Sequence, residues 1–563
     1  MPPSAIVAAS LDADDPYARE AQTFPTLSPE MAARIASYGI AEDAPDGTML
    51  FEQGQRGNDF FLVLTGEIDI LDHHGKNTVS IIHRHLAGQF SGELDLLNNR
   101  AILVSGRAGP NTRVVRVARA DFRRMAASEP DIGEIIMRAF ILRRVGMIRH
   151  PQGGVELIGP AHGGDTVRLA RFLIRNGYPH RLLDTEVDPD AEGFLDCFHL
   201  TADQLPVVIA PGHVLLRNPS NADLADALGL TETLDPARIH DVVVVGAGPA
   251  GLAAAVYAAS EGLDTIVIEA LAPGGQAGTS SKIENYLGFP TGISGQALAG
   301  RAQVQAQKFG ARLAIAHAAD GIDCTDRPLA VILDDGQRVQ GHSIVVATGA
   351  RYRKLDVADN DRFEGRGIHY AATAMEAGLC GTEEVIIVGG GNSAGQAAVF
   401  LSRSVGHVHI LVRGPGLAAT MSDYLIERID SSRKITLHPA TEISRLEGAT
   451  ILEQVTWTNR RTGASETRPI RNIFVMIGAV PNTGWLGDCL ELDKQGFVCT
   501  VAGSPYEASL PGIFAVGDVR AGSTKRVASG VGEGSVVVSS VHKYLEARRA
   551  SAAEAIESVS EAG

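Results

Sequence analysis

The feature that most constrains the fold is a glycine-rich turn that follows a run of β-branched residues at 242–245. The run predicts a buried parallel strand, and the alanine-rich stretch at 252–260 predicts a helix. Between them lie Gly246, Gly248 and Gly251. Glycine allows the sharp bend and lets a pyrophosphate reach the N–H groups that begin a helix. Residues 241–269 therefore predict a unit that binds the ADP part of a dinucleotide.

A second apolar run supports this prediction. It covers residues 265–268 and ends in Glu269, 18 residues after Gly251. A carboxylate at the end of the second strand can accept hydrogen bonds from a ribose. Strand, glycine turn, helix, strand and terminal acid together are far more specific than the glycine turn alone.

Composition excludes several classes of protein. A chain of 563 residues is long enough for about three or four domains. Its net charge is −16 and it has no long basic block, so nucleic acid is not an expected partner. No apolar run reaches the ~18 residues of a membrane span, and the N-terminus lacks a signal-peptide pattern. We therefore expect a cytoplasmic protein.

Cysteine usage points the same way. The five cysteines include no C-x-x-C pair. This pattern indicates a reducing compartment and argues against a disulfide framework or a zinc cluster, and no metal site is expected.

The first 150 residues predict a small β-rich module. Residues 1–25 are expected to be a disordered leader, and residues 26–150 hold short strands with glycine turns followed by helices, which is typical of a jelly roll. The segment resembles the cyclic-nucleotide-binding domain, notably at Gly92 and Glu93. The resemblance implies that Glu93 binds a ribose hydroxyl and that Arg100 pairs with a cyclic phosphate, because a guanidinium is planar, charged and bidentate.

Two alternatives stay open for this module. Its turn is shorter than the commonest form of the family, so Arg107 is a second candidate for the phosphate. Alternatively, the module is a structural jelly roll in which Glu93 and Arg100 pair with each other.

Residues 151–236 predict a second module with the order β-α-β followed by β-β-α. This order, with Pro206 ahead of an apolar strand, resembles the thioredoxin or glutaredoxin fold. The resemblance places a redox pair in the loop at 160–165, which holds no cysteine. Because disulfide exchange needs a thiolate, we expect a docking or linking domain. His162 in this loop is expected to be an exposed residue.

A second dinucleotide signature begins at residue 384. A β-branched run leads into Gly389, Gly391 and Ala394, and a helix and a second strand follow. Two ADP-binding units in one chain imply two cofactors brought together, usually a flavin and a nicotinamide.

The chain from 240 to 545 resembles the low-molecular-weight bacterial thioredoxin reductase family in both glycine clusters and in Gly517-Asp518. The resemblance implies an FAD domain at 240–355 and 480–545, an inserted NAD(P)H domain at 356–479, and a tail at 546–563. The fold expected for the chain is multidomain: a β jelly roll with helices, a thioredoxin-like α/β module and two Rossmann-like α/β domains. The implied FAD-binding residues are Gly246, Gly248, Pro249, Ala250, Gly251, Glu269, Gly275, Gln276, Asn285, Gly349, Gly517, Asp518, Arg526 and Val527. The implied NAD(P)H-binding residues are Gly389, Gly391, Asn392, Ser393, Ala394, Arg413 and Gly478.

One departure from the family concerns the redox cysteines. The family carries a Cys-Ala-Thr-Cys pair in the nicotinamide domain, where this chain has Ala371 and Ala374. Neither alanine can receive electrons from a flavin. The nearby Cys380 is single, and its partner would have to be Cys324, Cys489 or Cys499.

The other departure concerns the choice of nicotinamide. Of the three arginines that clamp the 2′-phosphate of NADPH in the family, this chain keeps Arg413. Val412 supplies no carboxylate for a free 2′-hydroxyl, so NADPH is favoured over NADH.

These observations predict an FAD-dependent NAD(P)H oxidoreductase whose electron acceptor is not a local disulfide. A quinone, another flavin, an iron protein or oxygen are the acceptors considered, and a cyclic nucleotide is a possible effector. Two alternatives are a thioredoxin-disulfide reductase that uses other cysteines and a flavoprotein sensor without turnover. The resemblance also implies a homodimer.

Overall fold

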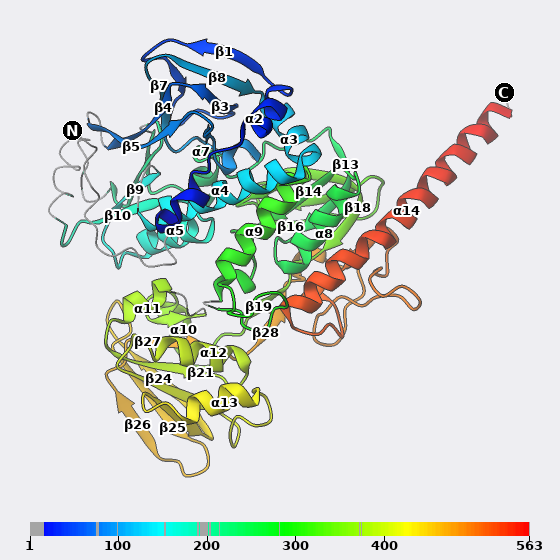
Figure 1. Ribbon diagram of the computed structural model, residues 1–563. Helices are drawn as coiled ribbons and strands as arrows, with labels where there is room; N and C mark the ends of the chain where they lie inside the picture. Colours follow the sequence, from blue (N-terminus) through cyan, green and yellow to red (C-terminus); the bar gives the residue numbers. More distant parts are fainter. Residues whose placement is uncertain are drawn as a thin grey trace. The chain divides into compact units, whose positions relative to one another are not determined.

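The structure is a computed structural model that describes residues 16–74, 78–97, 100–150, 154–188, 191, 201, 204–212, 214–280, 282–370, 372 and 374–561. The chain divides into two compact units. One unit holds the residues up to Thr233 together with Ala314–Ala316, and the other holds Leu234–Leu313 and the residues from His317 onward. The elements of each unit are labelled in Figure 1.

The first unit contains a β-sandwich of two four-stranded sheets, ordered β1-β8-β3-β6 and β2-β7-β4-β5. Its core includes the rings of Phe60, Phe90 and Phe122, with centroids of Phe60 and Phe90 5.5 Å apart. The strands are β1 (Ile40–Ala44), β2 (Met49–Phe51), β3 (Phe60–Thr65), β4 (Glu67–His74), β5 (Thr78–Leu86), β6 (Phe90–Ser91), β7 (Ser105–Ala108) and β8 (Thr112–Val117). The predicted β-rich module is therefore confirmed.

Helices flank the sandwich before and after it. They are η1 (Pro16–Arg19), α1 (Glu20–Thr23), α2 (Pro29–Ala36), η2 (Leu94–Leu97), α3 (Arg119–Ser128) and α4 (Pro130–Arg149). Ser28 caps α2, since its Oγ accepts a hydrogen bond from the Met31 N–H at 3.2 Å. The expectation of a disordered leader is wrong for residues 16–25, because η1 and α1 are helical and the buried Thr23 hydroxyl donates to the Pro16 carbonyl at 2.6 Å. Residues 1–15 lie outside the described part.

The first unit also holds a four-stranded sheet ordered β10-β9-β11-β12. β9 runs parallel to β10 and antiparallel to β11, which pairs with β12. The helix α5 buries Leu169, Phe172 and Leu173, and this i, i+3, i+4 spacing forms one apolar face. The elements are β9 (Val155–Gly159), α5 (Gly164–Arg175), β10 (His180–Asp184), β11 (Val207–Ala210), β12 (Val214–Arg217) and α7 (Asn221–Ala227). Cys197 lies outside the described residues.

The second unit is organised on a mixed seven-stranded sheet with the path β15-β14-β13-β18-β17-β16, to which β29 adds beside β18. β13 is parallel to β14 and β18, whereas β16 and β17 form an antiparallel extension. The strands are β13 (Ile239–Val245), β14 (Thr265–Glu269), β15 (Arg312–Ile315), β16 (Ala319–Asp323), β17 (Leu329–Leu333), β18 (Arg338–Val346) and β29 (Ile513–Ala515). All four valines of 242–245 are at most 2% exposed, as the β-branched run predicts.

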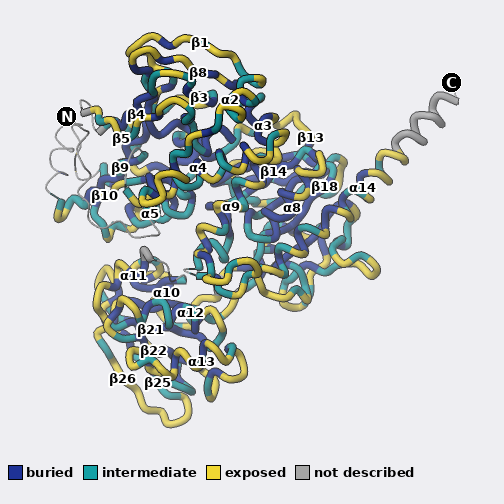
Figure 2. The backbone as a smooth tube through the Cα atoms, in the orientation of Figure 1, coloured by how far each residue is buried: buried dark blue, intermediate teal, exposed yellow. Residues whose placement is uncertain are grey.

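The helical elements attached to this sheet are α8 (Pro249–Ser260), η4 (Ala277–Thr279), α9 (Gly295–Lys308), η6 (Gly517–Val519) and α14 (Val527–Glu561). α14 packs closely against α8, since a Cβ on Gly534 would lie 2.1 Å from the carbonyl oxygen of Ala250, and Figure 2 shows α8 as largely buried. The predicted tail at 546–563 is not separate, because α14 continues as one helix through this region to residue 561.

The same unit contains a second Rossmann-like sheet, the parallel order β20-β27-β21-β22-β23, with an antiparallel sheet β24-β25-β26. The short pair β19 and β28 brings residues 350–352 beside residues 479–481. The elements are β19 (Ala350–Tyr352), α10 (Asn360–Phe363), β20 (Ile368–His369), α11 (Ala374–Cys380), β21 (Glu384–Val388), α12 (Asn392–Leu401), β22 (His407–Val412), α13 (Asp423–Asp430), β23 (Ile435–Pro439), β24 (Thr441–Glu447), β25 (Gln454–Asn459), β26 (Ser465–Arg468), β27 (Asn472–Val475), β28 (Ala479–Pro481) and η5 (Gly484–Leu486).

Among the helices in the described ranges, none has both the length and the apolar character that a membrane span requires.

Candidate nucleotide-binding sites

The first glycine turn joins β13 to α8 and can be built only from glycine at two positions. Gly246 has φ +104°, and a Cβ there would lie 2.4 Å from the carbonyl oxygen of Ala347. A Cβ on Gly251 would lie 1.8 Å from the carbonyl oxygen of Gly246. By contrast, the nearest atom to a Cβ on Gly248 is 4.0 Å away. The turn is therefore closed against the sheet and open at Gly248, ahead of the first N–H groups of α8.

Glu269 fixes the shape of this turn from the neighbouring strand β14. One carboxylate oxygen accepts a hydrogen bond from the Ala247 N–H at 2.8 Å, and the other accepts from the N–H groups of Leu271 and Ala272 at 3.0 and 3.2 Å. The carboxylate is half-buried and is held in one orientation by backbone donors. This is the place where the sequence predicts a ribose contact.

The Gly517-Asp518 motif lies beside the start of α8, although it is far away in the sequence. A Cβ on Gly517 would lie 2.8 Å from the Cβ of Ala250, which follows Pro249 in the first turn of α8. Glu533 of α14 holds the motif in place by accepting a hydrogen bond from the Gly517 N–H at 2.7 Å. The predicted residues Arg526 and Val527 lie where α14 begins.

The segment that follows β14, from Gly274 to Gln276, lies beside the first glycine turn. The Gly274 N–H donates to the Ala247 carbonyl at 2.7 Å, and a Cβ on Gly275 would lie 3.0 Å from the Cα of Gly248. The side-chain amide of Gln276 donates to the carbonyl of Ala350, the residue after Gly349. Asn285 is exposed, and its predicted flavin contact stays a prediction.

Electrostatics favour a polar ligand group at Asp518. Burial raises the pKa of the Asp518 carboxyl, and the Lys525 charge lowers it in part. Lys525 donates to the Asp518 carbonyl at 2.5 Å, and burial lowers the pKa of its ammonium group. A half-buried carboxyl next to an ammonium group suits hydrogen bonding to a hydroxyl-rich chain. The residues present therefore fit FAD.

The second glycine turn, between β21 and α12, repeats this geometry. Gly389 has φ +141°, and a Cβ there would lie 2.2 Å from the Met476 carbonyl oxygen. Gly391 is the N-cap of α12, and Ala394 is fully buried beneath it. Asn392 accepts from the N–H and hydroxyl of Ser422 at 2.7 and 2.9 Å. The turn fits the pyrophosphate of a pyridine nucleotide.

The remaining predicted NAD(P)H residues lie around this turn. Ser393 is exposed in the first turn of α12, and Gly478 has φ +94° immediately before β28. Arg413 is exposed directly after β22, where a 2′-phosphate would be met, whereas Val412 is 4% exposed and packs in the core.

The position of the family's redox pair is only partly described. Ala371 lies outside the described residues, and Ala374 begins α11. At the end of α11, Cys380 is 1% exposed and its thiol donates to the Glu376 carbonyl at 3.1 Å. Burial, followed by the charges of Glu383 and Glu376, raises the pKa of Cys380 to about 12. Cys380 is therefore a protonated thiol at neutral pH and a poor nucleophile.

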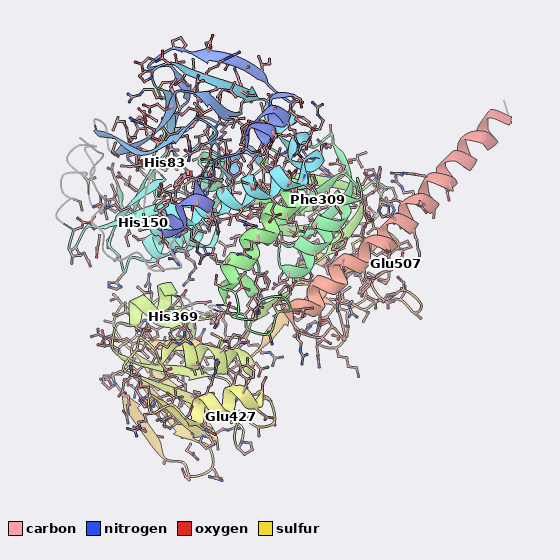
Figure 3. The ribbon with its side chains drawn as sticks, in the orientation of Figure 1. His83, His150, Phe309, His369, Glu427 and Glu507 are labelled. Carbon is pink, nitrogen blue, oxygen red and sulfur yellow. A yellow bond between two sulfur atoms is a disulfide. The ribbon has the colours of Figure 1, made fainter. Side chains whose placement is uncertain are left out.

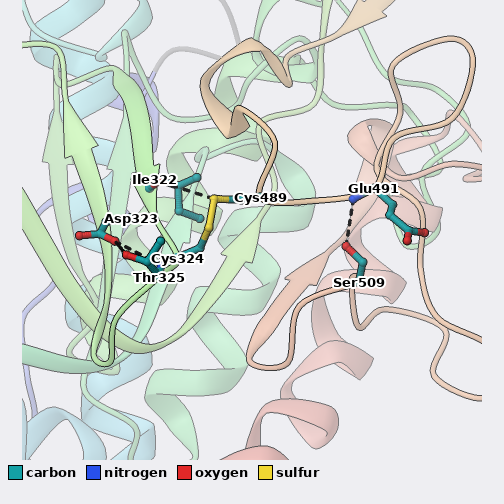
Figure 4. The surroundings of a disulfide bond; sticks show 7 residues. All are labelled: Ile322, Asp323, Cys324, Thr325, Cys489, Glu491 and Ser509. Atoms are coloured by element: carbon teal, nitrogen blue, oxygen red, sulfur yellow. Dashed lines mark hydrogen bonds between the residues drawn. A yellow bond between two sulfur atoms is a disulfide. The ribbon is translucent and has the colours of Figure 1, made fainter.

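The expectation against a disulfide is wrong. Cys324 and Cys489 form a disulfide that joins the loop after β16 to the segment after η5, with their Cα atoms 6.3 Å apart (Figure 4). The Cys489 sulfur also lies 3.7 Å from the Ile322 carbonyl oxygen. Two of the three possible partners of Cys380 are thereby paired with each other, and Cys499 is the free half-buried thiol.

In the first unit, Glu93 is already paired within the protein. Both of its carboxylate oxygens accept from Arg144 of α4, which also donates to Asp95 at 2.9 Å. Arg144 is therefore a partner of Glu93 that the sequence did not predict, and a pairing of Glu93 with Arg100 stays a prediction. Arg100 is buried, and burial lowers its pKa to about 10. Arg107 instead pairs with Asp69 at 3.2 Å.

The sequence reasoning did not find the arginines of α4 or Glu533. Arg143 and Arg144 are consecutive on a helix whose neighbouring residues Ala139 and Phe140 are buried. Two adjacent charges inside such an apolar face were the available signal, because at least one of them must point toward the core. Glu533 offered no comparable signal, because its role depends on a contact with Gly517 that the sequence does not reveal.

Comparison with known proteins agrees with this geometry. Residues 240–534 match the family described as pyridine nucleotide-disulphide oxidoreductase, and residues 42–129 match the cyclic nucleotide-binding domain. The chain is 34% identical over 307 residues to a thioredoxin reductase of Treponema pallidum, a match that covers 54% of this chain and 97% of that protein. It is 32% identical over 353 residues to NADPH-dependent thioredoxin reductase 3 of Arabidopsis thaliana, covering 59% of this chain but 65% of that enzyme.

Two solved structures show the same fold over the second unit. Thioredoxin reductase of Lactococcus lactis aligns with a TM-score of 0.51 at 29% identity, covering 54% of this chain and 98% of that one. Thioredoxin reductase of T. acidophilum aligns with a TM-score of 0.51 at 28% identity, covering 55% and 99%. With a cyclic nucleotide-binding domain ahead of its two Rossmann-like domains, the chain belongs to the pyridine nucleotide-disulphide oxidoreductase family of enzymes.

Proposed function

We propose that this protein is an FAD-dependent NAD(P)H oxidoreductase that reduces an acceptor other than a disulfide of its own nicotinamide domain. The observation that most strongly supports this proposal is a contrast within the second unit. Both glycine turns have the backbone geometry that dinucleotides require, whereas alanine occupies both positions of the family's redox pair. Bound FAD would accept a hydride from NAD(P)H and supply two electrons to the acceptor.

The chain's own residues hold and orient the two cofactors. The open side of Gly248 and the start of α8 would bind one pyrophosphate, and Gly391 at the start of α12 would bind the other. Asp518 and Gln276 would orient the flavin, and Arg413 would pair with the 2′-phosphate of NADPH. NADPH is the favoured nucleotide because no carboxylate stands at position 412.

A second candidate function is supported by the disulfide Cys324–Cys489. In this alternative the protein is a disulfide reductase that uses these two cysteines. Its support is weaker because nothing in the described residues carries a thiolate close to the second glycine turn: Cys380 is buried and its pKa is raised.

Steady-state oxidation of NADPH with a quinone, ferricyanide and thioredoxin as acceptors separates the two candidates. The proposal expects turnover with the quinone or ferricyanide that is equal in the wild type, in Cys380→Ser and in Cys324→Ser/Cys489→Ser. Thioredoxin-dependent turnover that disappears in the double variant would establish the alternative. If none of the acceptors supported turnover, the enzymatic proposal would be wrong and the flavoprotein sensor would remain.

The sheet β10-β9-β11-β12 supports the interpretation of residues 151–236 as a thioredoxin-like docking module. Pro206, whose preceding peptide bond is cis, lies beside the loop that follows β9, since a Cβ on Gly159 would be 3.0 Å from its Cβ. His162 in this loop is exposed. If the module docks the acceptor, His162→Glu should change the KM for a protein acceptor and leave the KM for NADPH unchanged. Equal KM values for the acceptor would contradict docking at this loop.

The matched cyclic nucleotide-binding domain supports regulation by a ligand of the first unit. The cyclic nucleotide effector, its contact with Arg100, the homodimer and the cytoplasmic location stay predictions. Calorimetry with cyclic AMP and cyclic GMP on wild type and Arg100→Ala tests the first two, and sedimentation tests the homodimer.

A further inference from the structure

The first unit encloses a cavity of about 220 Å³ between the β-sandwich and the helices α1 and α4. Apolar side chains form most of its wall, including Phe24, Phe51, Ile70, Leu103 and Met147. An apolar cavity of ~150 Å³ holds a benzene molecule, whereas pockets for drug-sized ligands begin at about 300 Å³. The volume thus suits one ring, or a short aliphatic chain, with a small polar substituent.

Three polar side chains face this cavity and each has a buried atom without a hydrogen-bond partner. The atoms are Nη2 of Arg143, Nδ1 of His85 and Nε2 of His83. Arg143 is 4% exposed and His85 is 3% exposed. Because a buried polar atom without a partner costs roughly 1–3 kcal/mol, three around one cavity indicate a bound group that satisfies them. Figure 3 labels His83 on the sandwich.

Two nitrogens of the Arg143 guanidinium are fixed by hydrogen bonds, and the third, Nη2, has no hydrogen-bond partner among the residues that the structure describes. Its Nε donates to the Thr23 carbonyl at 3.0 Å and its Nη1 donates to the Gly92 carbonyl at 3.0 Å. Its guanidinium also lies over the ring of Phe90, 4.8 Å from the centroid. These contacts leave Nη2 as a fixed, charged donor at the wall of the cavity.

Arg143 is the one arginine that lines the cavity, together with the carboxylates of Glu20, Glu93 and Asp95. Arg144 forms ion pairs with Glu93 and Asp95, whereas Arg143 forms no ion pair within the described part of the chain. Burial, with the nearby Glu93 charge, raises the pKa of Asp95 well above its ordinary value, which reduces the negative charge further. The two histidines are neutral, because burial and the Arg143 charge lower their pKa values, that of His83 to about 4. An anion bound at Arg143 would pair with a buried guanidinium whose hydrogen bonds to the described residues go only to carbonyl oxygens.

The ligand chemistry differs from that of a nucleotide. Glu93, the residue that would bind a ribose, has both oxygens on Arg144. Arg100, the predicted partner of a cyclic phosphate, is not among the residues that line the cavity. The single free nitrogen of Arg143 and two neutral imidazoles match the two oxygens of a carboxylate better than they match a sugar phosphate.

We infer that this cavity is a binding site for a small carboxylic acid with an apolar body, such as an aromatic or short aliphatic acid. Its carboxylate accepts hydrogen bonds from Arg143 and the two histidines, and its body fills the space lined by Phe24 and Leu103. The inference is independent of the oxidoreductase proposal, because it rests only on residues of the first unit.

Calorimetry on the full chain tests it with phenylacetate, benzoate and hexanoate, each paired with its neutral amide, and with cyclic AMP. We expect at least one acid to bind saturably and its amide to bind about tenfold or more weakly, because the amide loses a charge-assisted hydrogen bond. Arg143→Gln should weaken that acid to the same degree, whereas Arg138→Gln, an exposed arginine on the same helix, should leave it unchanged.

A second variant keeps the test decisive if Arg143→Gln does not fold. Val104→Phe places a ring in the cavity without altering any charge, and it should abolish binding of the acid. Three results would overturn the inference: no acid in the set binds, acid binding survives Val104→Phe, or cyclic AMP displaces the acid and binds more tightly than it does.

Discussion

The two glycine turns that match nucleotide-binding motifs, at Gly246–Gly251 and at Gly92–Glu93, differ in what holds their acidic residue. Glu269 is half-buried and is oriented by neutral backbone N–H groups at the edge of the first turn. Glu93, whose side chain is 10% exposed, forms an ion pair with Arg144. Neutral amides leave the negative charge of Glu269 uncompensated, whereas the Arg144 guanidinium compensates that of Glu93. The comparison teaches that a matched motif predicts a fold more securely than it predicts a ligand.

The largest expected effect is at the first turn. Gly251→Val should abolish FAD binding, because its Cβ would overlap the Gly246 carbonyl oxygen at 1.8 Å and force the turn open. Flavin absorbance per purified chain measures this. Gly300→Ala on α9 is the matched control, since a Cβ there meets no atom within 4 Å, and it should retain full flavin. Normal flavin content in Gly251→Val would mean that the turn does not bind the cofactor.

The second-largest effect is expected for the ion pair between Arg144 and Glu93 at the Gly92–Glu93 turn. Arg144→Ala should destabilise the first unit by about 3–5 kcal/mol, because it removes the cation that pairs with the buried Asp95 and with Glu93, whose side chain is 10% exposed. Denaturant unfolding of the full chain, followed by a probe in the first unit, measures the loss. Arg138→Ala on the exposed face of α4 should cost less than about 1 kcal/mol. Similar costs for both arginines would show that the ion pair is not what stabilises this turn.

The histidines of the cavity predict an acid-sensitive first unit. Burial, followed by the Arg143 charge, lowers the pKa of His83 to about 4, whereas it is near 6.5 in an unfolded chain. Between these values the unfolded state binds more protons, so the free energy of unfolding falls as pH falls from about 6.5 to about 4. The full contribution of His83 is roughly 3 kcal/mol and is present above this range. His83→Phe keeps a ring next to Phe24 and should give a shallower pH dependence; an unchanged slope would exclude His83 as its source.

The smallest effect is expected at the second dinucleotide turn. Arg413→Ala should raise the KM for NADPH by about tenfold and leave that for NADH unchanged, since it removes one charge-assisted contact with a 2′-phosphate. Kinetics with both nucleotides measure the ratio. Equal changes for NADPH and NADH would place the phosphate elsewhere.

Local sequence patterns predicted most of the fold, because the signals for its main helices and strands lie within a few residues of each element. The valines at 242–245, the Ser28 cap and the short strands of the sandwich all have signals within a few residues. The family resemblance supplied the pairing of Gly517 with the first turn, which local patterns alone do not specify. The contacts of Glu93 with Arg144 and of Cys324 with Cys489 join residues that are distant in the chain, and several partners were equally plausible from the sequence.

The central claim is that no disulfide of the nicotinamide domain shares electrons with the flavin. Anaerobic titration of the flavin-loaded protein with NADPH counts the electrons taken up per FAD, and Cys324→Ser/Cys489→Ser serves as the comparison. The account predicts two electrons, the capacity of the flavin alone, in both proteins. Uptake of four electrons in the double variant would reveal another disulfide coupled to the flavin and would contradict the account.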